Sequence, residues 1–214
     1  MKQRMRRGRL IVFEGTDGTG KSTQLKLLHG HLEKQGLPVV ATREPTDGVY
    51  GRQIRNLYVN RHQYSREEEL ELFLADRREH VRDFLHPNLD QGRIILCDRY
   101  YFSTAAYQGA LGLDPDEILR RNDFAPEPDL VLLFRAPLQL SIERITNGRG
   151  ETLNRFEQRE FLEKVAAIFA AIKRSNIRRI DASGSIEEVH RQVVAAVAPL
   201  FPPPRPLQFP SALP

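Results

Sequence analysis

Three glycines and a lysine lie between the first apolar run of the chain, Leu10–Phe13, and a stretch with helical periodicity. From Gly15 to Ser22 the residues fit the pattern G-x-x-x-x-G-K-[ST], with a strand expected before it and a helix after it. Such glycines let the backbone wrap around a phosphate, and the N-terminus of the following helix adds partial positive charge. The sequence therefore predicts a strand–loop–helix unit that binds a nucleoside triphosphate. A glycine-rich turn with an exposed lysine is the alternative.

The residues of this loop have separate expected roles. Lys21 is expected to reach the β and γ phosphates, exposed to the ligand rather than packed, and the Ser22 hydroxyl is expected to ligate Mg²⁺. We predict that the nucleotide is bound by Gly15, Thr16, Asp17, Gly18, Thr19, Gly20, Lys21, Ser22 and Thr23.

The length and composition fit an ordinary globular protein with one domain. The chain has 214 residues, of which 40% are hydrophobic and 28% charged. No apolar run approaches the roughly 18 to 20 residues that span a bilayer. The single cysteine, Cys97, excludes an internal disulfide and a multi-cysteine zinc site, so a cytoplasmic setting is expected. The net charge of +4 and the pI near 9.4 favour anionic partners without specifying one.

Short apolar runs alternate with helical patterns along the chain. Strands are expected at residues 10–13, 38–42, 93–97, 129–134 and 177–180, and helices at 22–34, 66–89, 138–145, 158–174 and 186–198. Because the strands are rich in Ile, Val and Leu and are separated by helices, they predict a parallel sheet covered on both faces. The predicted fold class is α/β, a doubly wound five-stranded parallel sheet of the P-loop NTPase type with a short lid.

Two segments interrupt this alternation. Residues 146–155 are polar, contain glycine and lie between two predicted helices, as expected of a lid at about 146–156. Residues 1–198 are predicted to form a single domain. The tail, 199–214, is rich in proline and cannot continue a helix. We expect this tail to wrap the surface or to lack fixed structure, and a polyproline ligand is the alternative.

A second polar group follows a later apolar run. The run ends at Asp98, whose carboxylate is expected at the carboxyl edge of the sheet, beside the glycine loop, where it can hold a water bound to Mg²⁺. Arg99 offers a guanidinium to a second anion at the same place, and a surface ion pair is the alternative. Cys97 is interpreted as a small buried hydrophobic residue.

Two further groups could recognise a nucleotide base. Phe73 and Arg77 are four residues apart and share one face of a predicted helix, so they could stack a base and clamp its phosphate. A core position for Phe73 is the alternative. A cluster of side chains after Arg99 could read a base edge, or could simply begin a helix; its members are Ser103, Thr104, Tyr107 and Gln108.

Taken together, these motifs resemble those of the thymidylate kinase family. The matching segments occur in the family's order over residues 10 to about 183: FEGTDGTGKSTQ, TREP at 42–45, the helix with Phe73 and ADRREH, DRYYFSTAAYQG at 98–109, PDLVLLF at 128–134 and NRFEQ at 154–158. The resemblance implies a kinase domain that uses ATP and Mg²⁺ to phosphorylate dTMP to dTDP. It implies no nucleic-acid or membrane partner, and by analogy with the family a homodimer is expected.

The resemblance also implies roles for single residues. Phe73 is expected to stack on thymine, and Arg99 to take the acceptor phosphate. Tyr107 lies where family members crowd the 2′ position and favour deoxyribose. The other substrate-binding residues that the resemblance implies are Glu44, Arg55, Arg77, Ser103, Thr104 and Gln108.

The resemblance further points to an arginine in the lid. Residues 16–19 of the glycine loop contain no arginine, which matches the subgroup of the family that supplies the catalytic arginine from the lid. Arg149 is the predicted residue and Arg155 is the alternative. Asp17 is expected to orient the metal-bound water or the substrate. The predicted catalytic residues are thus Lys21, Arg99, Arg149 and Asp17.

Three other functions fit parts of this pattern. A P-loop GTPase would carry an N/T-K-x-D tetrapeptide, and the sequence contains none. A nucleotide-binding module without enzymatic activity is the alternative from a different class, and the intact phosphate-binding residues argue against it. A P-loop kinase for another nucleoside monophosphate or for a deoxynucleoside is the nearest alternative. A nucleoside acceptor would need a carboxylate base for its neutral hydroxyl. A comparison of dTMP with thymidine as the acceptor therefore distinguishes a nucleoside monophosphate kinase from a deoxynucleoside kinase.

Overall fold

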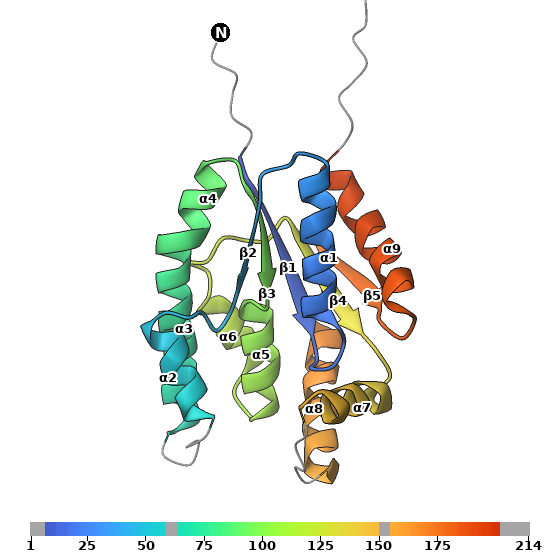
Figure 1. Ribbon diagram of the computed structural model, residues 1–214. Helices are drawn as coiled ribbons and strands as arrows, with labels where there is room; N and C mark the ends of the chain where they lie inside the picture. Colours follow the sequence, from blue (N-terminus) through green and yellow to red (C-terminus); the bar gives the residue numbers. More distant parts are fainter. Residues whose placement is uncertain (1–6, 59–63, 150–154, 202–214) are drawn as a thin grey trace, which may run out of the picture.

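The computed structural model describes residues 7–58, 64–149 and 155–201, without the side chains of residues 147–158 (Figure 1). The strands are β1 (Arg9–Gly15), β2 (Val39–Arg43), β3 (Ile94–Asp98), β4 (Leu130–Arg135) and β5 (Ile177–Asp181). The helices are α1 (Lys21–Lys34), α2 (Val49–Leu57), α3 (Arg66–His80), α4 (His86–Asp90), α5 (Tyr101–Ala110), α6 (Pro115–Arg120), α7 (Leu138–Arg149), α8 (Arg155–Ala171) and α9 (Ile186–Val197). A π-helical turn, Val81–Leu85, joins α3 to α4, and a 3₁₀ turn, Ala198–Leu200, follows α9.

The five strands form one parallel sheet in the order β2-β3-β1-β4-β5. Its central strand, β1, pairs with β3 so that Phe13 lies opposite Asp98, and with β4 so that Gly15 lies opposite Phe134. The predicted five-stranded parallel sheet is therefore confirmed, and each strand lies within two residues of its predicted position.

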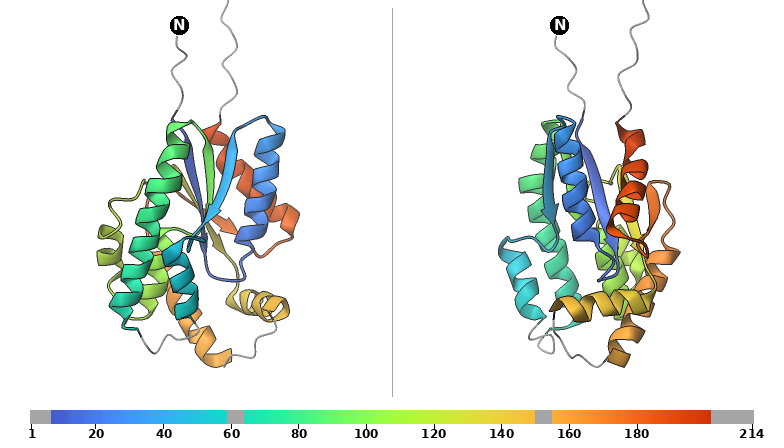
Figure 2. Two further views of the ribbon diagram at one scale, coloured as in Figure 1. Left: turned by 60° about the vertical axis from the view of Figure 1, so that its left-hand side comes forward. Right: turned by 45° about the vertical axis from the view of Figure 1, so that its right-hand side comes forward.

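Helices cover both faces of this sheet, as Figure 2 shows. On one face, α1 and α9 pack on alternate residues of the strands, such as Ile11, Phe13 and Leu132. On the other face, the π-helical turn and α4 pack against Leu10 and Val12, while α5 and α8 pack against β4. The central strands have buried side chains on both faces, and this explains why their sequences are continuous apolar runs.

The connections create a crevice at the carboxyl end of the sheet. The strands β1 and β3 are neighbours, but β1 leads into α1 on one face and β3 leads into α5 on the other. Helices that leave adjacent strands toward opposite faces leave a gap between the strand ends, and such gaps are the usual ligand sites of open parallel sheets. The glycine loop and Arg99 follow directly from these two strands, so both lie at this gap.

The helices differ from the predicted ones in number and in regularity. The helices α2, α5 and α6 were not predicted; α5 buries residues on more than one face and so lacks a clear helical period. The predicted helix 66–89 forms, but with the π-helical turn just before Pro87, which has no N–H to continue a regular ladder. No helix in the described ranges is long and apolar enough to cross a membrane.

The two helices that flank the predicted lid are longer at their lid ends than predicted, and the lid itself stays a prediction. The helix α7 continues to Arg149 instead of ending at residue 145, and α8 begins at Arg155 instead of residue 158. Thr146 lies within α7, where its hydroxyl donates to the Ile142 carbonyl of the preceding turn at 3.0 Å. Residues 150–154 of the predicted lid and residues 202–214 of the predicted tail lie outside the described ranges.

Candidate active site

The glycine loop between β1 and α1 needs its glycines for conformation and for space. Gly15, Gly18 and Gly20 have φ values of 134°, 78° and 83°, a region that residues with a side chain rarely adopt. A Cβ atom on Gly15 would collide with the Phe134 carbonyl, and one on Gly18 with the Ser141 carbonyl of α7. The loop is therefore held between β4 and α7 in a shape that only this glycine pattern allows.

The first turn of α1 is arranged to accept an anion. Its N-cap residue, Gly20, has no side chain to cap the helix, and no acidic residue stands in the first turn. Gly20, Ser22 and Thr23 are exposed to solvent. The N–H groups at a helix start carry partial positive charge and bind phosphate well, which agrees with the predicted nucleotide site.

The Lys21 side chain differs from its prediction, because it is buried rather than exposed. Its residue is 6% exposed, and Nζ donates to the Thr16 carbonyl at 2.8 Å, across the loop. Thr19 Oγ1 donates to the same carbonyl at 2.8 Å. Burial, together with nearby Arg99, lowers the pKa of Lys21 from 10.5 to about 8, against the opposing effect of Asp17 and other carboxylates. An amine held in this way gains charge stabilisation when a phosphate enters the loop.

The residues predicted to bind Mg²⁺ lie side by side. The Ser22 hydroxyl, at the start of α1, donates to Asp98 Oδ2 at 2.5 Å, at the end of β3. Within the described ranges, no group of three or more His, Cys, Asp or Glu residues is close enough to hold a metal ion. Mg²⁺ often takes only one or two protein oxygens and completes its octahedron with water and substrate phosphates, so a hydroxyl and a carboxylate fit this ion.

Arg99 follows Asp98 in a strained backbone conformation and spans the crevice. Its φ of 70° makes it the one described non-glycine residue with positive φ. Its guanidinium donates to Asp17 Oδ1 at 2.8 Å and to Ser103 Oγ at 2.9 Å, and it lies over the Tyr107 ring at 5.0 Å. A longer bond of 3.3 Å reaches the Gly15 carbonyl. Arg99 thus joins the glycine loop to the start of α5.

A cavity of about 380 Å³ opens beside Arg99. Its lining includes Asp17 and eight of the nine predicted substrate-binding residues, namely Glu44, Phe73, Arg77, Arg99, Ser103, Thr104, Tyr107 and Gln108. Phe73 is half-buried on α3, and no described core cluster contains it, which favours the predicted stacking role over a core role. The cavity is therefore the place where the sequence-predicted acceptor residues meet.

Arg55 is the predicted substrate-binding residue that does not line this cavity in the described part of the chain. Its guanidinium donates to the Pro45 carbonyl at 3.3 Å and pairs with Asp47 at 3.1 Å, and its side chain is 38% exposed. The helix α2, on which it lies, starts from the loop that follows the cavity residues Glu44 and Pro45. A substrate contact by Arg55 stays a prediction.

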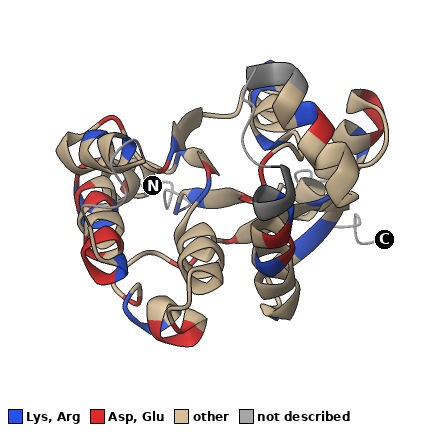
Figure 3. Cartoon of the chain, turned by 90° about the horizontal axis from the view of Figure 1, so that it is seen from below, with Lys and Arg blue, Asp and Glu red and all other residues tan. Residues whose placement is uncertain are grey.

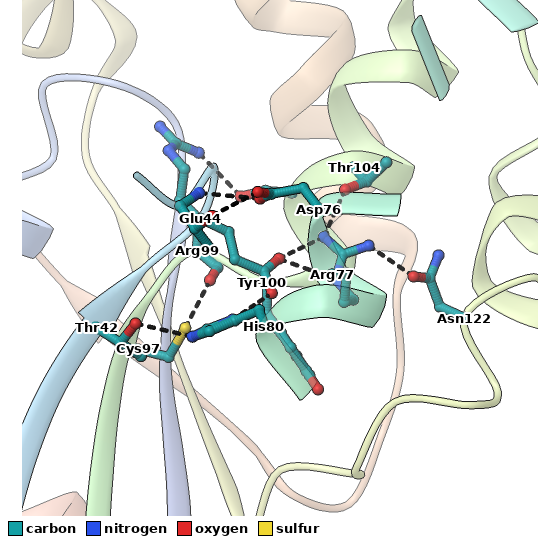
Figure 4. A network of polar contacts seen from close by, with 12 residues as sticks. Thr42, Glu44, Asp76, Arg77, His80, Cys97, Arg99, Tyr100, Thr104 and Asn122 are labelled. Atoms are coloured by element: carbon teal, nitrogen blue, oxygen red, sulfur yellow. Dashed lines mark hydrogen bonds and ion pairs between the residues drawn. The ribbon is translucent and has the colours of Figure 1, made fainter. Parts of the chain in front are cut away.

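Arg77 and Glu44 form a buried pair that walls the cavity (Figure 4). Arg77 is 1% exposed, and its Nε and Nη2 donate to Glu44 Oε2 at 2.9 and 2.6 Å. Arg77 also donates to Thr104 Oγ1 at 2.9 Å and to Asn122 Oδ1 at 2.6 Å. Four hydrogen bonds therefore fix the guanidinium before any ligand arrives, which suits a group that orients a substrate.

His80 completes this network behind Glu44. Its Nδ1 lies 2.9 Å from Glu44 Oε1, and its Nε2 lies 2.8 Å from Thr42 Oγ1. Burial raises the pKa of Glu44, but Arg77 and His80 outweigh it and hold the pKa below its ordinary value. Glu44 is therefore a carboxylate that keeps Arg77 in place.

Sequence reasoning missed several residues of the site. The cavity is also lined by Pro45, Tyr58, Glu69, Tyr100 and Phe161. Glu69 is 3% exposed and accepts a hydrogen bond from Gln108 Nε2 at 2.8 Å. A further missed residue, Glu14, is fully buried at the end of β1. A charged residue at the end of an otherwise apolar central strand was a signal that could have revealed Glu14.

Burial raises the pKa of Glu14 from 4.5 to about 7, although hydrogen bonds from Ser103 and the charge of Arg99 oppose this change. The folded protein then holds a proton that the unfolded chain loses between these two pH values. The free energy of unfolding should therefore fall as the pH rises across this window, by up to about 3 kcal/mol. The charged groups that interact with Glu14 in the folded protein are Lys21 and Arg99.

Urea denaturation of the wild type and of Glu14→Gln at several pH values measures this effect. We expect the wild type to lose stability relative to the variant as the pH rises from 4.5 to about 7, because glutamine does not titrate. Two stability curves that run parallel across the window would show that the pKa of Glu14 is not raised by folding.

Figure 3 views the chain from below, toward the carboxyl end of the sheet, and its ribbon carries both blue Lys or Arg positions and red Asp or Glu positions. Two arginines at this end are paired with carboxylates, Arg99 with Asp17 and Arg77 with Glu44. The side chains of Arg149 and Arg155, the predicted lid arginines, lie outside the described part. Their predicted roles stay predictions.

Known proteins are similar in sequence to this chain over almost its whole length. The family model for thymidylate kinase matches residues 13–193. A thymidylate kinase of Desulfotalea psychrophila is 55% identical over 194 residues, which cover 91% of this chain and 96% of that one. A thymidylate kinase of Akkermansia muciniphila is 46% identical over 198 residues, which cover 92% of this chain and 95% of that one.

A solved structure agrees with these sequence matches. The crystal structure of thymidylate kinase from Ehrlichia chaffeensis superposes with a TM-score of 0.71 at 29% identity, covering 89% of this chain and 99% of that one. The residues that match the family model extend from the glycine loop through the cavity residues into α9. The chain therefore belongs to the thymidylate kinase family.

Proposed function

We propose that this protein transfers the γ-phosphate of ATP to the 5′-phosphate of dTMP, giving ADP and dTDP. Membership of the thymidylate kinase family supports this reaction. The observation that carries the proposal is the position of Arg99, which contacts both the glycine loop, through Asp17, and the cavity residues Ser103 and Tyr107. A donor phosphate in the loop and an acceptor phosphate at the cavity would meet at this guanidinium.

The reaction requires that the substrates be positioned and their charge neutralised, and it does not require a strong base. The acceptor is a phosphate monoester, which is already anionic near neutral pH because its second pKa is about 6. Two polyanions must be brought together, and the charge that develops during transfer must be stabilised. Lys21 would bind the donor phosphates, and Arg99 would bind the acceptor phosphate.

Ser22 and Asp98 would hold Mg²⁺, since their side-chain oxygens lie in direct contact at the edge of the glycine loop. The ion would supply positive charge that neutralises part of the charge on the phosphates during transfer. The loop backbone and the uncapped start of α1 would orient the same phosphates from the other side.

The nucleoside of the acceptor would occupy the cavity. Phe73 offers an aromatic face for the base, and the fixed Arg77 guanidinium lies one helical turn further along α3. The Tyr107 hydroxyl donates to Asp17 Oδ2 at 2.9 Å, and this bond anchors the ring where the sugar would lie. An anchored ring of this kind would favour a deoxyribose over a ribose.

Replacing Phe73 by alanine should weaken the binding of dTMP much more than the binding of ATP. Stacking of a base on an aromatic ring contributes about 1 to 3 kcal/mol, so the KM for dTMP should rise about tenfold to a hundredfold. Phe124→Ala is a matched control, because Phe124 is also half-buried but stacks on Arg78 and does not line the cavity. Steady-state kinetics with each substrate varied in turn measure both values. Equal losses for dTMP and ATP, together with a lower melting temperature, would instead mark Phe73 as a core residue.

Identification of the products tests the proposed reaction. With ATP and Mg²⁺, we expect ³¹P NMR to show ADP and dTDP from dTMP, and no phosphorylated product from thymidine. Thymidine carries a neutral hydroxyl that would need a general base, and the proposed reaction assigns that role to no residue. Phosphorylation of thymidine would favour a deoxynucleoside kinase, and ATP binding without transfer to any acceptor would favour a non-enzymatic module. The predicted homodimer and cytoplasmic setting stay proposals.

A further inference from the structure

A buried carboxylate links the glycine loop to the turn between β3 and α5, which contains Arg99. Glu14, the residue before Gly15, is 0% exposed. Its Oε1 accepts the backbone N–H of Tyr100 at 2.9 Å and that of Ser103 at 3.1 Å, and its Oε2 accepts the Ser103 hydroxyl at 2.5 Å. One side chain of β1 therefore holds three donors at the start of α5.

These bonds replace the capping that α5 lacks. Tyr100 is the N-cap residue of α5 and makes no side-chain cap, whereas α3 and α9 each begin with a serine and a glutamate in a complete capping box. Glu14 accepts the N–H groups of the N-cap residue and of the third helical residue, which are the two donors that a capping box satisfies. A surface serine serves this purpose twice elsewhere in the chain, so capping alone does not require a buried acid.

The same carboxylate is connected to Arg99 through the Ser103 hydroxyl. Arg99 Nη1 donates to Ser103 Oγ at 2.9 Å, and the Ser103 hydroxyl donates onward to Glu14. The hydrogen bond of Glu14 with the N–H of Tyr100 also fixes the peptide that follows the strained Arg99 residue. Backbone strain of this kind persists only where the surroundings hold it, and it is common at functional sites.

We propose that Glu14 is a positioning residue for the phosphoryl acceptor: through Ser103 and the Tyr100 peptide it holds the Arg99 guanidinium at the glycine loop. This proposal rests on the proposed function, since it assigns Arg99 to the acceptor phosphate. A carboxylate in β1 suits this task, because the glycine loop begins at the next residue. The donor site and the acceptor arginine are thereby fixed to one another through a single rigid strand.

Glu14→Gln separates this role from simple packing. Glutamine keeps an oxygen for the two backbone N–H groups but offers an NH₂ group to Ser103. Two donors, that NH₂ and Arg99 Nη1, then converge on the Ser103 oxygen, and the negative charge behind Arg99 is lost. Because burial disfavours the charged form of Glu14 and glutamine is neutral, the variant should be at least as stable as the wild type at neutral pH.

The expected result is a stable protein with impaired acceptor chemistry. A guanidinium displaced by about 1 Å can reduce a rate about 10²-fold, so we expect a loss of this order in kcat/KM for dTMP, with the KM for ATP unchanged. Glu188→Gln is the matched control, because it alters the capping box of α9 without contact to Arg99. Wild-type kinetics for Glu14→Gln would overturn the proposal.

A double-mutant cycle tests the connection through Ser103. If Glu14 acts through this hydroxyl, Ser103→Ala should show a similar loss, Ser103→Thr should restore activity, and the double variant should be no worse than the worse single variant. Losses that multiply would overturn the connection. If Glu14→Gln fails to fold, Ser103→Ala with wild-type dTMP kinetics overturns the proposal by itself.

A crystal structure of Glu14→Gln tests the same inference without turnover. We expect Arg99 Nη1 to lie beyond about 3.5 Å from Ser103 Oγ, outside hydrogen-bond distance. An unchanged Arg99 side chain would overturn the positioning role even if the protein were a kinase for another acceptor. Absence of dTMP phosphorylation by the wild type would instead refute the proposed function.

Discussion

Lys21→Ala is expected to reduce kcat about 10²- to 10³-fold, the usual loss when one fixed donor to a developing charge is removed. The Lys21 amine is preorganised over the glycine loop by its bond to the Thr16 carbonyl, so it can turn to a bound phosphate without leaving the loop. Single-turnover measurements with saturating ATP and dTMP give the rate directly.

The fold should tolerate this substitution although the lysine is buried. Burial lowers the pKa of Lys21 to about 8, which means that the folded protein holds its charged form at a cost. Lys34→Ala is a matched control, because Lys34 is exposed at the far end of the same helix. Full turnover by Lys21→Ala would refute the assignment of the glycine loop as the donor site.

Arg149→Ala is expected to cause the largest kinetic loss. An arginine that stabilises the transferred phosphoryl group contributes about 10³ to 10⁵ in kcat in related reactions. Since such a contact strengthens in the transition state, kcat should fall steeply while the Kd values of ATP and dTMP change little. The phosphate loop carries no arginine at residues 16–19, so the charge must be supplied from elsewhere.

Arg155→Ala is the comparison that makes this prediction decisive. Both arginines flank residues 150–154, Arg149 as the last residue of α7 and Arg155 as the first of α8. Single-turnover rates of the two variants, measured side by side, show which of them serves the reaction. An unchanged kcat for Arg149→Ala, with a steep loss for Arg155→Ala, would transfer the role to Arg155.

The sheet could be predicted from the sequence because each strand is an apolar run bounded by turn residues. Two of the helices that were missed lack a clear helical pattern. The helix α6 has only six residues, and α5 is buried too broadly to show one apolar face. The ends of the helices next to the predicted lid were predicted wrongly, because residues 146–149 are polar or glycine and yet continue α7, which composition alone does not reveal.

Site residues that belong to a known sequence motif could be predicted from the sequence. Contacts between side chains that only the tertiary fold brings together could not. Ser22 and Asp98 are 76 residues apart, and the strand-to-helix pattern brought them together as expected. Lys21 was expected to be exposed, but a motif does not show that the Thr16 carbonyl accepts a hydrogen bond from its amine. Glu69 joins the cavity only because α3 packs beside α5, a tertiary contact without a local sequence signal.

The proposed function depends most on the identity of the acceptor. A coupled assay with ATP and Mg²⁺ can compare kcat/KM for dTMP, dUMP, dCMP, dAMP, dGMP and thymidine under one set of conditions. We expect the highest value for dTMP, and a selective loss of that value in Phe73→Ala. A higher kcat/KM for any other acceptor in this panel, or no transfer to dTMP, would contradict it.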